Sequence, residues 1–214
     1  MKQKIWTFGD SYTSAFRDME WADQYTKWKG YVPKVYGELI SDWMNIELSN
    51  KGKGGFDNYS ILQMICNHAD KINSEDIIII GWSNVIRFRL VNDFGGWCRV
   101  LSNYSRNAPE FVVNDISDNT LNEMLVNRQH PLHLTEIRSW IKLLDLTFHK
   151  NMVIHWSPFH NNISNHSFGC AKYEKIKFET NGKLNDGHFS EKGQFDLAKD
   201  LMEIINKTKS KKII

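Results

Sequence analysis

The sequence predicts an α/β domain in which a parallel β-sheet is covered by helices on both faces. Four short apolar runs have the character of strands, and segments with helical spacing lie between them. Strands that alternate with helices form a parallel sheet with helical layers on its two faces. The run Ile77–Ile80 consists of four isoleucines, as expected for a strand buried on both faces. Polar and glycine-rich motifs follow the strands directly, where sites form in such sheets.

The expected strands and helices alternate in chain order. The strands are Lys4–Phe8, Asn45–Leu48, Asp76–Ile80 and Met152–His155. Each expected helix carries apolar residues three or four positions apart, which places them on one helical face. These helices are Val32–Met44, Tyr59–Ile72, Leu134–Phe148 and Phe195–Ile205. Ser190 precedes the last helix and is a residue type that favours the N-cap position.

The stretch from residue 85 to residue 131 does not follow this alternation. It contains Gly95-Gly96-Trp97, Pro109 and several Asn and Asp residues. We interpret residues 85–131 as an insertion with short helices, which lies either over the site or at an interface. The chain shows no internal repeat and no low-complexity linker, so residues 1–214 are expected to form a single domain.

Composition narrows the classes of function. The 214 residues are 41% hydrophobic and 24% charged, a globular balance that can bury a core. The net charge of +2 does not indicate a basic surface that binds nucleic acid. The lysine-rich run 207–212 is interpreted as a solvated terminus. No apolar run reaches the roughly 18 residues of a membrane helix, and the first residues have strand character rather than that of a secretory signal.

The cysteines point to a reducing compartment. Cys66, Cys98 and Cys170 are widely separated and odd in number, which argues against a disulfide framework or a zinc site. We therefore expect a cytoplasmic protein with reduced thiols and no membrane partner.

A serine and a histidine stand near opposite ends of the chain in contexts that suit nucleophilic catalysis. Gly9-Asp10-Ser11 ends the first strand and places a hydroxyl at its tip. Such a hydroxyl needs a base within hydrogen-bond reach, and the base needs a group that orients it. His188 can supply the base and Asp186 the orienting carboxylate, if the turn at Gly187 directs both inward. The sequence therefore predicts catalytic roles for Ser11, His188 and Asp186.

A tetrahedral intermediate also needs hydrogen-bond donors placed in advance for its oxyanion. The backbone N–H of Ser11 is one candidate. The glycine-rich segment 49–58 follows the second strand and offers the N–H of a glycine. The segment Gly81-Trp82-Ser83-Asn84 follows the third strand and offers a side-chain amide. These three donors would form an oxyanion hole.

The four motifs occur in the order found in the SGNH (GDSL-like) hydrolases, and the chain resembles that family from residue 4 to about residue 205. The resemblance implies a flavodoxin-like three-layer α/β/α fold. It also implies esterase, lipase, thioesterase or carbohydrate-deacetylase chemistry without a metal or organic cofactor. Carried over by position, Ser11 is the nucleophile and His188 the base, with Asp186 behind it. Gly55 and Asn84 complete the oxyanion hole with the Ser11 N–H.

Two departures from the family pattern leave alternatives open. The family usually has Gly-x-Asn-Asp after the third strand, whereas residues 81–85 are Gly-Trp-Ser-Asn-Val. The side-chain donor is therefore either Asn84 or Ser83. The last family motif is usually Asp-x-x-His, but here Asn185 holds the usual position of the Asp. Either Asp186 orients the histidine, or the uncharged Asn185 does and the site approaches a dyad.

The remaining histidines do not predict a metal site. His130 and His133 lie beside a proline, and His155, His160 and His166 follow the fourth strand. A metal site needs ligands at defined spacing with supporting carboxylates, and no such pattern is present.

For some aromatic and basic residues the sequence leaves two roles open, one structural and one functional. Trp82, Trp97 and Trp156 either pack in the core or line a pocket for a sugar or an acyl group. Arg87 and Arg89, just past the third strand, either orient an anionic substrate group or form structural salt bridges.

The predicted function is a serine hydrolase that acts on a carbohydrate O-acetyl ester or a small acyl ester. The tryptophans are a modest argument for the sugar ester. Two other classes stay open: a catalytically inactive module with this fold that binds a ligand, and a structural subunit of a larger assembly. The sequence leaves the acyl group, the alcohol and the oligomeric state undecided.

Overall fold

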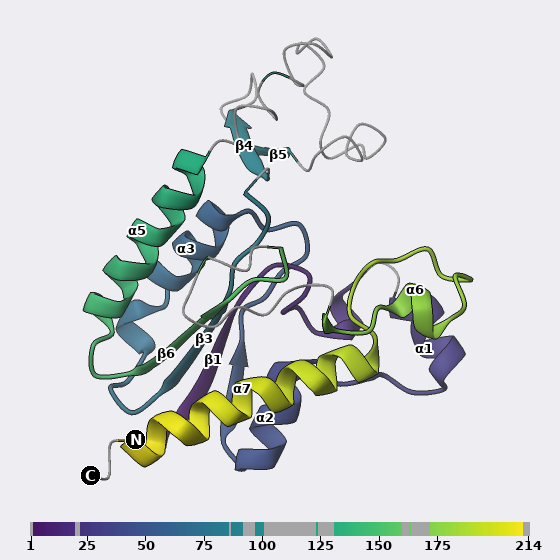
Figure 1. The fold of residues 1–214 in the computed structure, drawn as a ribbon, viewed down its shortest axis with the longest axis horizontal. Coiled ribbons are helices and arrows are strands. Elements are labelled where there is room, and N and C mark those ends of the chain that lie inside the picture. Colours follow the sequence, from purple (N-terminus) through teal and green to yellow (C-terminus); the bar gives the residue numbers. More distant parts are fainter. Residues whose placement is uncertain are drawn as a thin grey trace.

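The computed structural model describes residues 2–19, 22–85, 87–91, 97–100, 123, 131–159, 163 and 172–211. Four parallel strands form one sheet in the order β2-β1-β3-β6 (Figure 1). The strands are β1 (Lys4–Gly9), β2 (Glu47–Asn50), β3 (Ile77–Gly81) and β6 (Met152–Trp156). The sheet confirms the predicted α/β class, and every predicted strand is present in it.

Helices cover both faces of this sheet and complete a three-layer α/β/α arrangement (Figure 1). On one face lie α2 (Tyr36–Met44) and α7 (Glu191–Lys211). On the other face lie α3 (Asn58–Cys66) and α5 (Pro131–Thr147). These are the four helices predicted from apolar spacing. The spacing therefore identified the helix faces that pack on the sheet.

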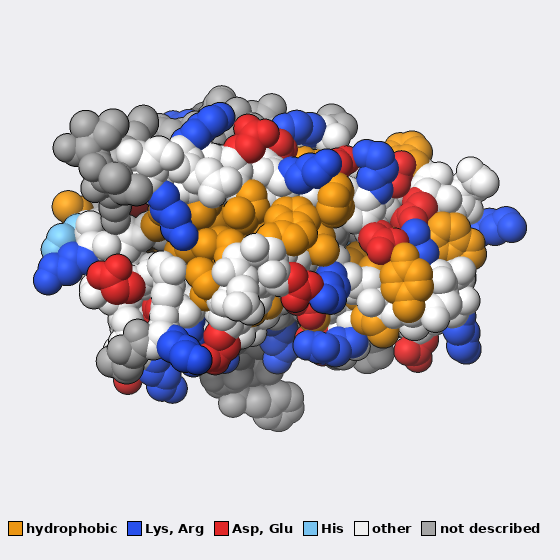
Figure 2. Space-filling view, turned by 90° about the horizontal axis from the view of Figure 1, so that it is seen from below, with side chains coloured by type: hydrophobic (Ala, Val, Ile, Leu, Met, Phe, Trp, Pro, Cys, Tyr) orange, Lys and Arg blue, Asp and Glu red, His pale blue; other side chains and the backbone are white. Residues whose placement is uncertain are grey.

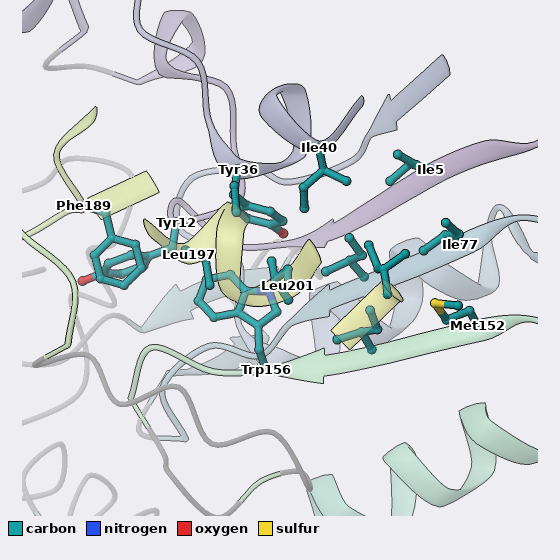
Figure 3. Close-up of a cluster of buried hydrophobic side chains, with 14 of the residues drawn as sticks. Ile5, Tyr12, Tyr36, Ile40, Ile77, Met152, Trp156, Phe189, Leu197 and Leu201 are labelled. Atoms are coloured by element: carbon teal, nitrogen blue, oxygen red, sulfur yellow. The ribbon is translucent and has the colours of Figure 1, made fainter. Parts of the chain in front are cut away.

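The isoleucine run of β3 serves both layers, because successive side chains of a strand point to opposite faces. Ile77 and Ile79 belong to the cluster beneath α2 and α7, which Figure 3 shows in close-up. Ile78 and Ile80 belong to the cluster beneath α3 and α5. All four are almost inaccessible to solvent, and burial of each such side chain stabilises the fold by about 1.5–3 kcal/mol.

Local backbone chemistry explains where two predicted elements begin later than expected. Asn45 adopts a left-handed conformation with φ 52° and ends α2, so β2 starts two residues after its predicted start. Val32 precedes Pro33, and a residue before proline disfavours the helical conformation. Helix α2 accordingly begins at Tyr36 rather than at Val32.

Helix α3 is shorter than the predicted segment. It ends at Cys66, and a separate 3₁₀ turn, η2 (Ala69–Lys71), replaces its expected continuation to Ile72. The Nδ1 atom of His68 lies 2.9 Å from the carbonyl oxygen of Met64. The Met64 carbonyl, which lies near the end of the helix, therefore has a polar partner outside the regular helical hydrogen-bond pattern.

Apolar periodicity in the sequence does not predict three of the short elements. They are η1 (Phe16–Asp18), α1 (Ala22–Lys29) and α6 (Ile176–Glu179). Each is too short, or too polar, to present a repeating apolar stripe. The N-cap prediction for α7 is confirmed, because the Ser190 hydroxyl accepts the N–H of Gly193 at 3.1 Å.

The predicted insertion begins with a β-hairpin, so the expectation of short helices is wrong there. Strands β4 (Phe88–Val91) and β5 (Trp97–Val100) pair antiparallel in a sheet of their own. Two short strand-like runs on either side of Gly95-Gly96 are a hairpin signal that the sequence contains. Most of the stretch from residue 101 to residue 130 lies outside the described residues, so its expected position, either over the site or at an interface, stays a prediction.

The surface of the α2–α7 layer is mixed in character. Hydrophobic side chains gather along the middle of the face seen in Figure 2, with charged side chains around them. Trp43 and Phe195, on these two helices, are both exposed, and their rings pack edge to face with centroids 5.5 Å apart.

Among the described helices, none combines the length and the apolar character needed to cross a membrane.

Candidate active site

The carboxyl ends of the strands lie level with one another. Gly9 of β1 is in register with Gly81 of β3, and Gly81 is in register with Trp156 of β6. On the other side of β1, Thr7 is in register with Asn50, the last residue of β2. The loops that follow these strands therefore leave the sheet along one edge, where the predicted site residues lie.

A tight turn presents Ser11 directly after β1. The carbonyl oxygen of Asp10 accepts the N–H groups of Thr13 and Ser14, both at 3.0 Å, which folds the chain sharply back. A Cβ atom on Gly9 would overlap the side chain of Thr13, so this turn requires a glycine at that position. Ser11 is 8% exposed and so is largely buried.

The segment that carries His188 is held against α6. The first N–H of α6, from Ile176, donates to the carbonyl oxygen of His188 at 2.9 Å, and the next, from Lys177, donates to the carbonyl oxygen of Asp186 at 3.1 Å. These are donors that a helix start leaves unpaired within the helix itself. The one-turn helix, which no periodicity reveals, thereby fixes the backbone of the histidine motif.

Aromatic packing brings the two ends of the chain together. Tyr12, next to the serine, packs edge to face on Phe189, next to the histidine, with ring centroids 4.8 Å apart. Both rings belong to the core cluster in Figure 3, where they lie side by side. The hydroxyl of Tyr12 also donates to the carbonyl oxygen of Gly187 at 3.3 Å. This ring contact and this hydrogen bond hold the serine turn next to the histidine motif.

The hydroxyl, imidazole and carboxylate predicted from the sequence form a continuous hydrogen-bonded row. Ser11 Oγ lies 2.6 Å from His188 Nε2, and His188 Nδ1 lies 2.6 Å from Asp186 Oδ1. A carboxylate can only accept, so Nδ1 carries the proton of the neutral ring and Nε2 is free to accept from the serine hydroxyl. That is the tautomer a general base needs.

Asp186, and not Asn185, is the residue that contacts the imidazole. The same Oδ1 atom also accepts the backbone N–H of His188 at 2.7 Å, which fixes the carboxylate relative to the ring. Asn185 is exposed to solvent. Its position in the usual family spacing therefore does not make it the orienting group.

Two of the donors predicted from the sequence are backbone N–H groups. Gly55 has φ 75° and occupies the third position of a turn closed by the Phe56 N–H, which donates to the Lys53 carbonyl oxygen at 3.3 Å. Glycine adopts this positive φ, which type II and type I′ turns have at their third position, without steric cost. Within the part of the chain that the structure describes, the N–H groups of Ser11 and Gly55 donate to no protein acceptor. Partly buried N–H groups without a protein partner are available for a ligand oxygen.

The contacts of Ser83 separate the two candidates for the side-chain donor. The Ser83 hydroxyl is completely buried and donates to Asp10 Oδ2 at 2.7 Å. It is therefore committed to the protein and does not serve an oxyanion. Asn84 follows it in the chain and is partly buried, so Asn84 stays the predicted donor.

The sequence left the roles of two residues near the site undecided. The ring of Tyr12 packs against the imidazole of His188, with centroids 4.8 Å apart. Arg87 forms an ion pair of 2.9 Å with Asp10, so its structural alternative is the one observed. Their only signal in the sequence is their closeness to the serine and to the end of β3. The side chain of Arg89 lies outside the described residues.

Other candidates belong to the core. Trp82 and Trp156 are completely buried, so neither offers a surface for a ligand. His155 is buried and lies between Trp82 Nε1 and Asp145 Oδ1, each 3.1 Å from a ring nitrogen. No group of three or more potential metal ligands occurs among the described residues, which do not include His130, His160 or His166.

A charged network braces α1 against α6 and α7. Lys29 pairs with Glu179 and with Glu191, the latter at 3.0 Å, and Tyr25 donates to Glu179 while accepting the N–H of Glu191. Burial lowers the pKa of Lys29, but its hydrogen bonds to the two carboxylates outweigh this and leave it above 10.5. Burial raises the pKa of Glu191, but hydrogen bonds from Tyr31 and Lys29 outweigh this and leave it below 4.5.

Comparison with known proteins finds likeness in structure only. No protein-family model matches the sequence, and no curated protein matches it. An acetyl xylan esterase from the rumen bacterium Butyrivibrio proteoclasticus is 12% identical with a TM-score of 0.47, and the match covers 97% of this chain and 64% of that one. This chain thus spans less than two thirds of that protein.

Two further solved structures are similar. A carbohydrate esterase, whose active site is described as having divergent catalytic and non-catalytic binding functions, is 16% identical with a TM-score of 0.45 over 95% of this chain and 68% of that one. A member of the lipolytic G-D-S-L family from Veillonella parvula is 16% identical with a TM-score of 0.39 over 95% and 98%. These values say nothing about the substrate of the present chain. Its parallel sheet with a helical layer on each face is the three-layer α/β/α arrangement that the resemblance to the SGNH hydrolases implies.

Proposed function

We propose that this protein is a serine hydrolase that cleaves a carboxylic ester. The observation that carries the proposal is the row Ser11 Oγ, His188 Nε2 and Nδ1, and Asp186 Oδ1, with both gaps at 2.6 Å. Residues 177 positions apart in the chain meet at this distance.

The first half of the reaction transfers the acyl group to the serine. His188 Nε2 takes the proton of Ser11 as Oγ bonds to the ester carbonyl carbon. The carbonyl oxygen becomes an oxyanion, which the N–H groups of Ser11 and Gly55 and the Asn84 amide stabilise. The C–O bond to the alcohol then breaks, and the proton on His188 passes to the departing alcohol oxygen.

The second half regenerates the enzyme with water as the nucleophile. His188 accepts a proton from water, whose oxygen attacks the acyl carbon and re-forms the oxyanion. When the bond to Ser11 Oγ breaks, the proton returns to the serine and the carboxylic acid leaves. Asp186 accepts the hydrogen bond of Nδ1 throughout and stabilises the imidazolium by its charge. No step requires a metal or an organic cofactor.

The substrate is proposed to be a small acyl ester or the O-acetyl ester of a carbohydrate. Trp82 and Trp156 lie in the core and not around the site, so these two tryptophans do not favour a sugar ester. Trp97 has its side chain outside the described residues. Both ester classes therefore enter the test on equal terms.

The test compares the wild type with Ser11→Ala and a matched control, Ser14→Ala. Ser14 lies in the same turn, is buried, and its hydroxyl has no hydrogen-bond partner among the described residues. Hydrolysis of p-nitrophenyl acetate and of an acetylated sugar is measured, together with covalent labelling by a fluorophosphonate. Ser11→Ala should lose labelling and at least about 10⁴-fold in kcat, whereas Ser14→Ala should change little.

A folded wild type that neither hydrolyses these esters nor labels would contradict the proposal. It would favour the alternative from the sequence, a module with this fold that binds without turnover. Labelling that persists in Ser11→Ala would show that another nucleophile reacts.

A further inference from the structure

A buried carboxylate lies directly beside the proposed nucleophile. Asp10 is 1% exposed, and no step of the reaction above uses it. Its Oδ1 atom accepts the N–H of Tyr12 at 3.0 Å, and its Oδ2 atom accepts from Ser83 Oγ at 2.7 Å and from Arg87 Nη1 at 2.9 Å. A buried charge is costly unless it is paired, so this carboxylate depends on Arg87.

One nitrogen of Arg87 contacts the loops after three different strands. Nη1 reaches Asp10 in the loop after β1, the carbonyl oxygen of Phe56 at 3.4 Å in the loop after β2, and Ser83 Oγ at 3.0 Å in the loop after β3. These loops carry, in the same order, the three proposed oxyanion donors. The guanidinium also lies over the ring of Phe159, 5.8 Å from its centroid, which limits its freedom to move.

A second contact ties the loops after β2 and β3 without Arg87. Asn58, the first residue of α3, receives the N–H of Ser83 at 2.6 Å and donates to the Ser83 carbonyl oxygen at 3.0 Å. Asp57 caps the same helix by accepting the Ser60 N–H at 2.6 Å. The side chain of Asn58 therefore joins the loops after β2 and β3. Arg87 adds an ionic link from this pair to Asp10 in the serine turn, beside the direct hydrogen bond from Ser83 to Asp10.

We propose that Arg87 is a positioning residue that sets the spacing between Ser11 and the donors Gly55 and Asn84. The inference rests on the proposed hydrolase function. Arg87 acts through Asp10 and Ser83 and is not assigned a contact with the substrate. An oxyanion hole works only when its donors stand at hydrogen-bond distance from the developing charge, and a shift of about 1 Å can cost about 10²-fold in rate.

The contacts predict how different replacements behave. Arg87→Gln removes the positive charge and leaves the buried carboxylate of Asp10 without its cationic partner, although the Tyr12 N–H and the Ser83 hydroxyl still donate to it. Arg87→Lys keeps a charge, and a single ammonium can replace some contacts because all three come from one nitrogen. The lysine variant should therefore recover part of what the glutamine variant loses.

The matched control is Asp76→Asn. Asp76 is an equally buried carboxylate, 1% exposed, at the opposite end of the sheet, where it accepts the N–H groups of Lys4 and Asn73 and the indole N–H of Trp6. Its replacement disturbs a buried hydrogen-bonded charge without touching the site. Any effect of general destabilisation should therefore appear in this variant as well.

The kinetic test uses p-nitrophenyl acetate. Arg87→Gln should lower kcat by about 10²-fold with KM within about threefold, since the donors act on the transition state. Arg87→Lys should lose about tenfold or less, and Asp76→Asn should keep its kcat. An unchanged kcat in Arg87→Gln with an active wild type would overturn the inference and leave the hydrolase function standing.

Amide hydrogen exchange tests the same inference without activity. Arg87→Gln should exchange faster than the wild type in segments 10–14, 55–58 and 82–85, and Asp76→Asn should not. Unchanged exchange in these segments would overturn the inference. An inactive wild type whose three segments respond as expected would instead contradict the hydrolase function and keep the tethering role.

Discussion

Replacement of Asp186 by asparagine tests which group orients the imidazole. The carboxylate lies 2.6 Å from His188 Nδ1, and the two side chains are only 16% and 23% exposed. When His188 holds the serine proton, a unit positive charge stands about 4 Å from the centre of the carboxylate charge. At an effective dielectric constant of about 20 this attraction is worth about 4 kcal/mol.

Asp186→Asn should lower kcat for p-nitrophenyl acetate by about 10³-fold, because about 1.4 kcal/mol corresponds to a factor of ten in rate. The loss can reach about 10⁴-fold if the amide NH₂ turns to Nδ1 and forces the wrong tautomer. The fold should persist, since asparagine has nearly the same shape and can still accept the N–H of His188.

Asn185→Ala is the matched control, because Asn185 is adjacent and exposed. It should keep kcat within about threefold. The reasoning is refuted if Asp186→Asn is as active as the wild type, or if Asn185→Ala loses as much activity as Asp186→Asn does.

Two further predictions concern the oxyanion hole and acid stability. Asn84→Ala should lower kcat by about 10²–10³-fold with little change in KM, because one donor to the transition state is lost; a loss confined to KM would instead indicate substrate binding. The pKa of Glu191 is below 4.5, since hydrogen bonds from Tyr31 and Lys29 outweigh its burial. Its contribution to stability is therefore fully present above that pH and is lost as the pH falls through the lowered value. The difference in denaturant midpoint between wild type and Glu191→Gln should accordingly shrink on acidification from pH 7 to pH 3, and a constant difference would contradict this account.

The sheet and its four large helices were predictable because their signals are local. A run such as Ile77–Ile80, or apolar residues at helical spacing, records which side chains are buried. Boundaries were less accurate where a single backbone conformation decides them, as at Asn45. The one-turn α6 carries no periodic signal, yet it holds the backbone of the histidine motif. The hairpin β4–β5 also has a local signal, two strand-like runs on either side of Gly95-Gly96, but we expected short helices in that stretch.

By itself the sequence determined which chemical groups follow which strands, because residue identity and periodicity are properties of short segments. Only the tertiary structure decided which neighbours these groups meet. Asp186 rather than Asn185 contacts the histidine, and Ser83 contacts Asp10, because the direction of a side chain depends on loops packed from distant parts of the chain. The meeting of Ser11 and His188 likewise depends on the burial of Tyr12 against Phe189, a contact between residues far apart in the chain.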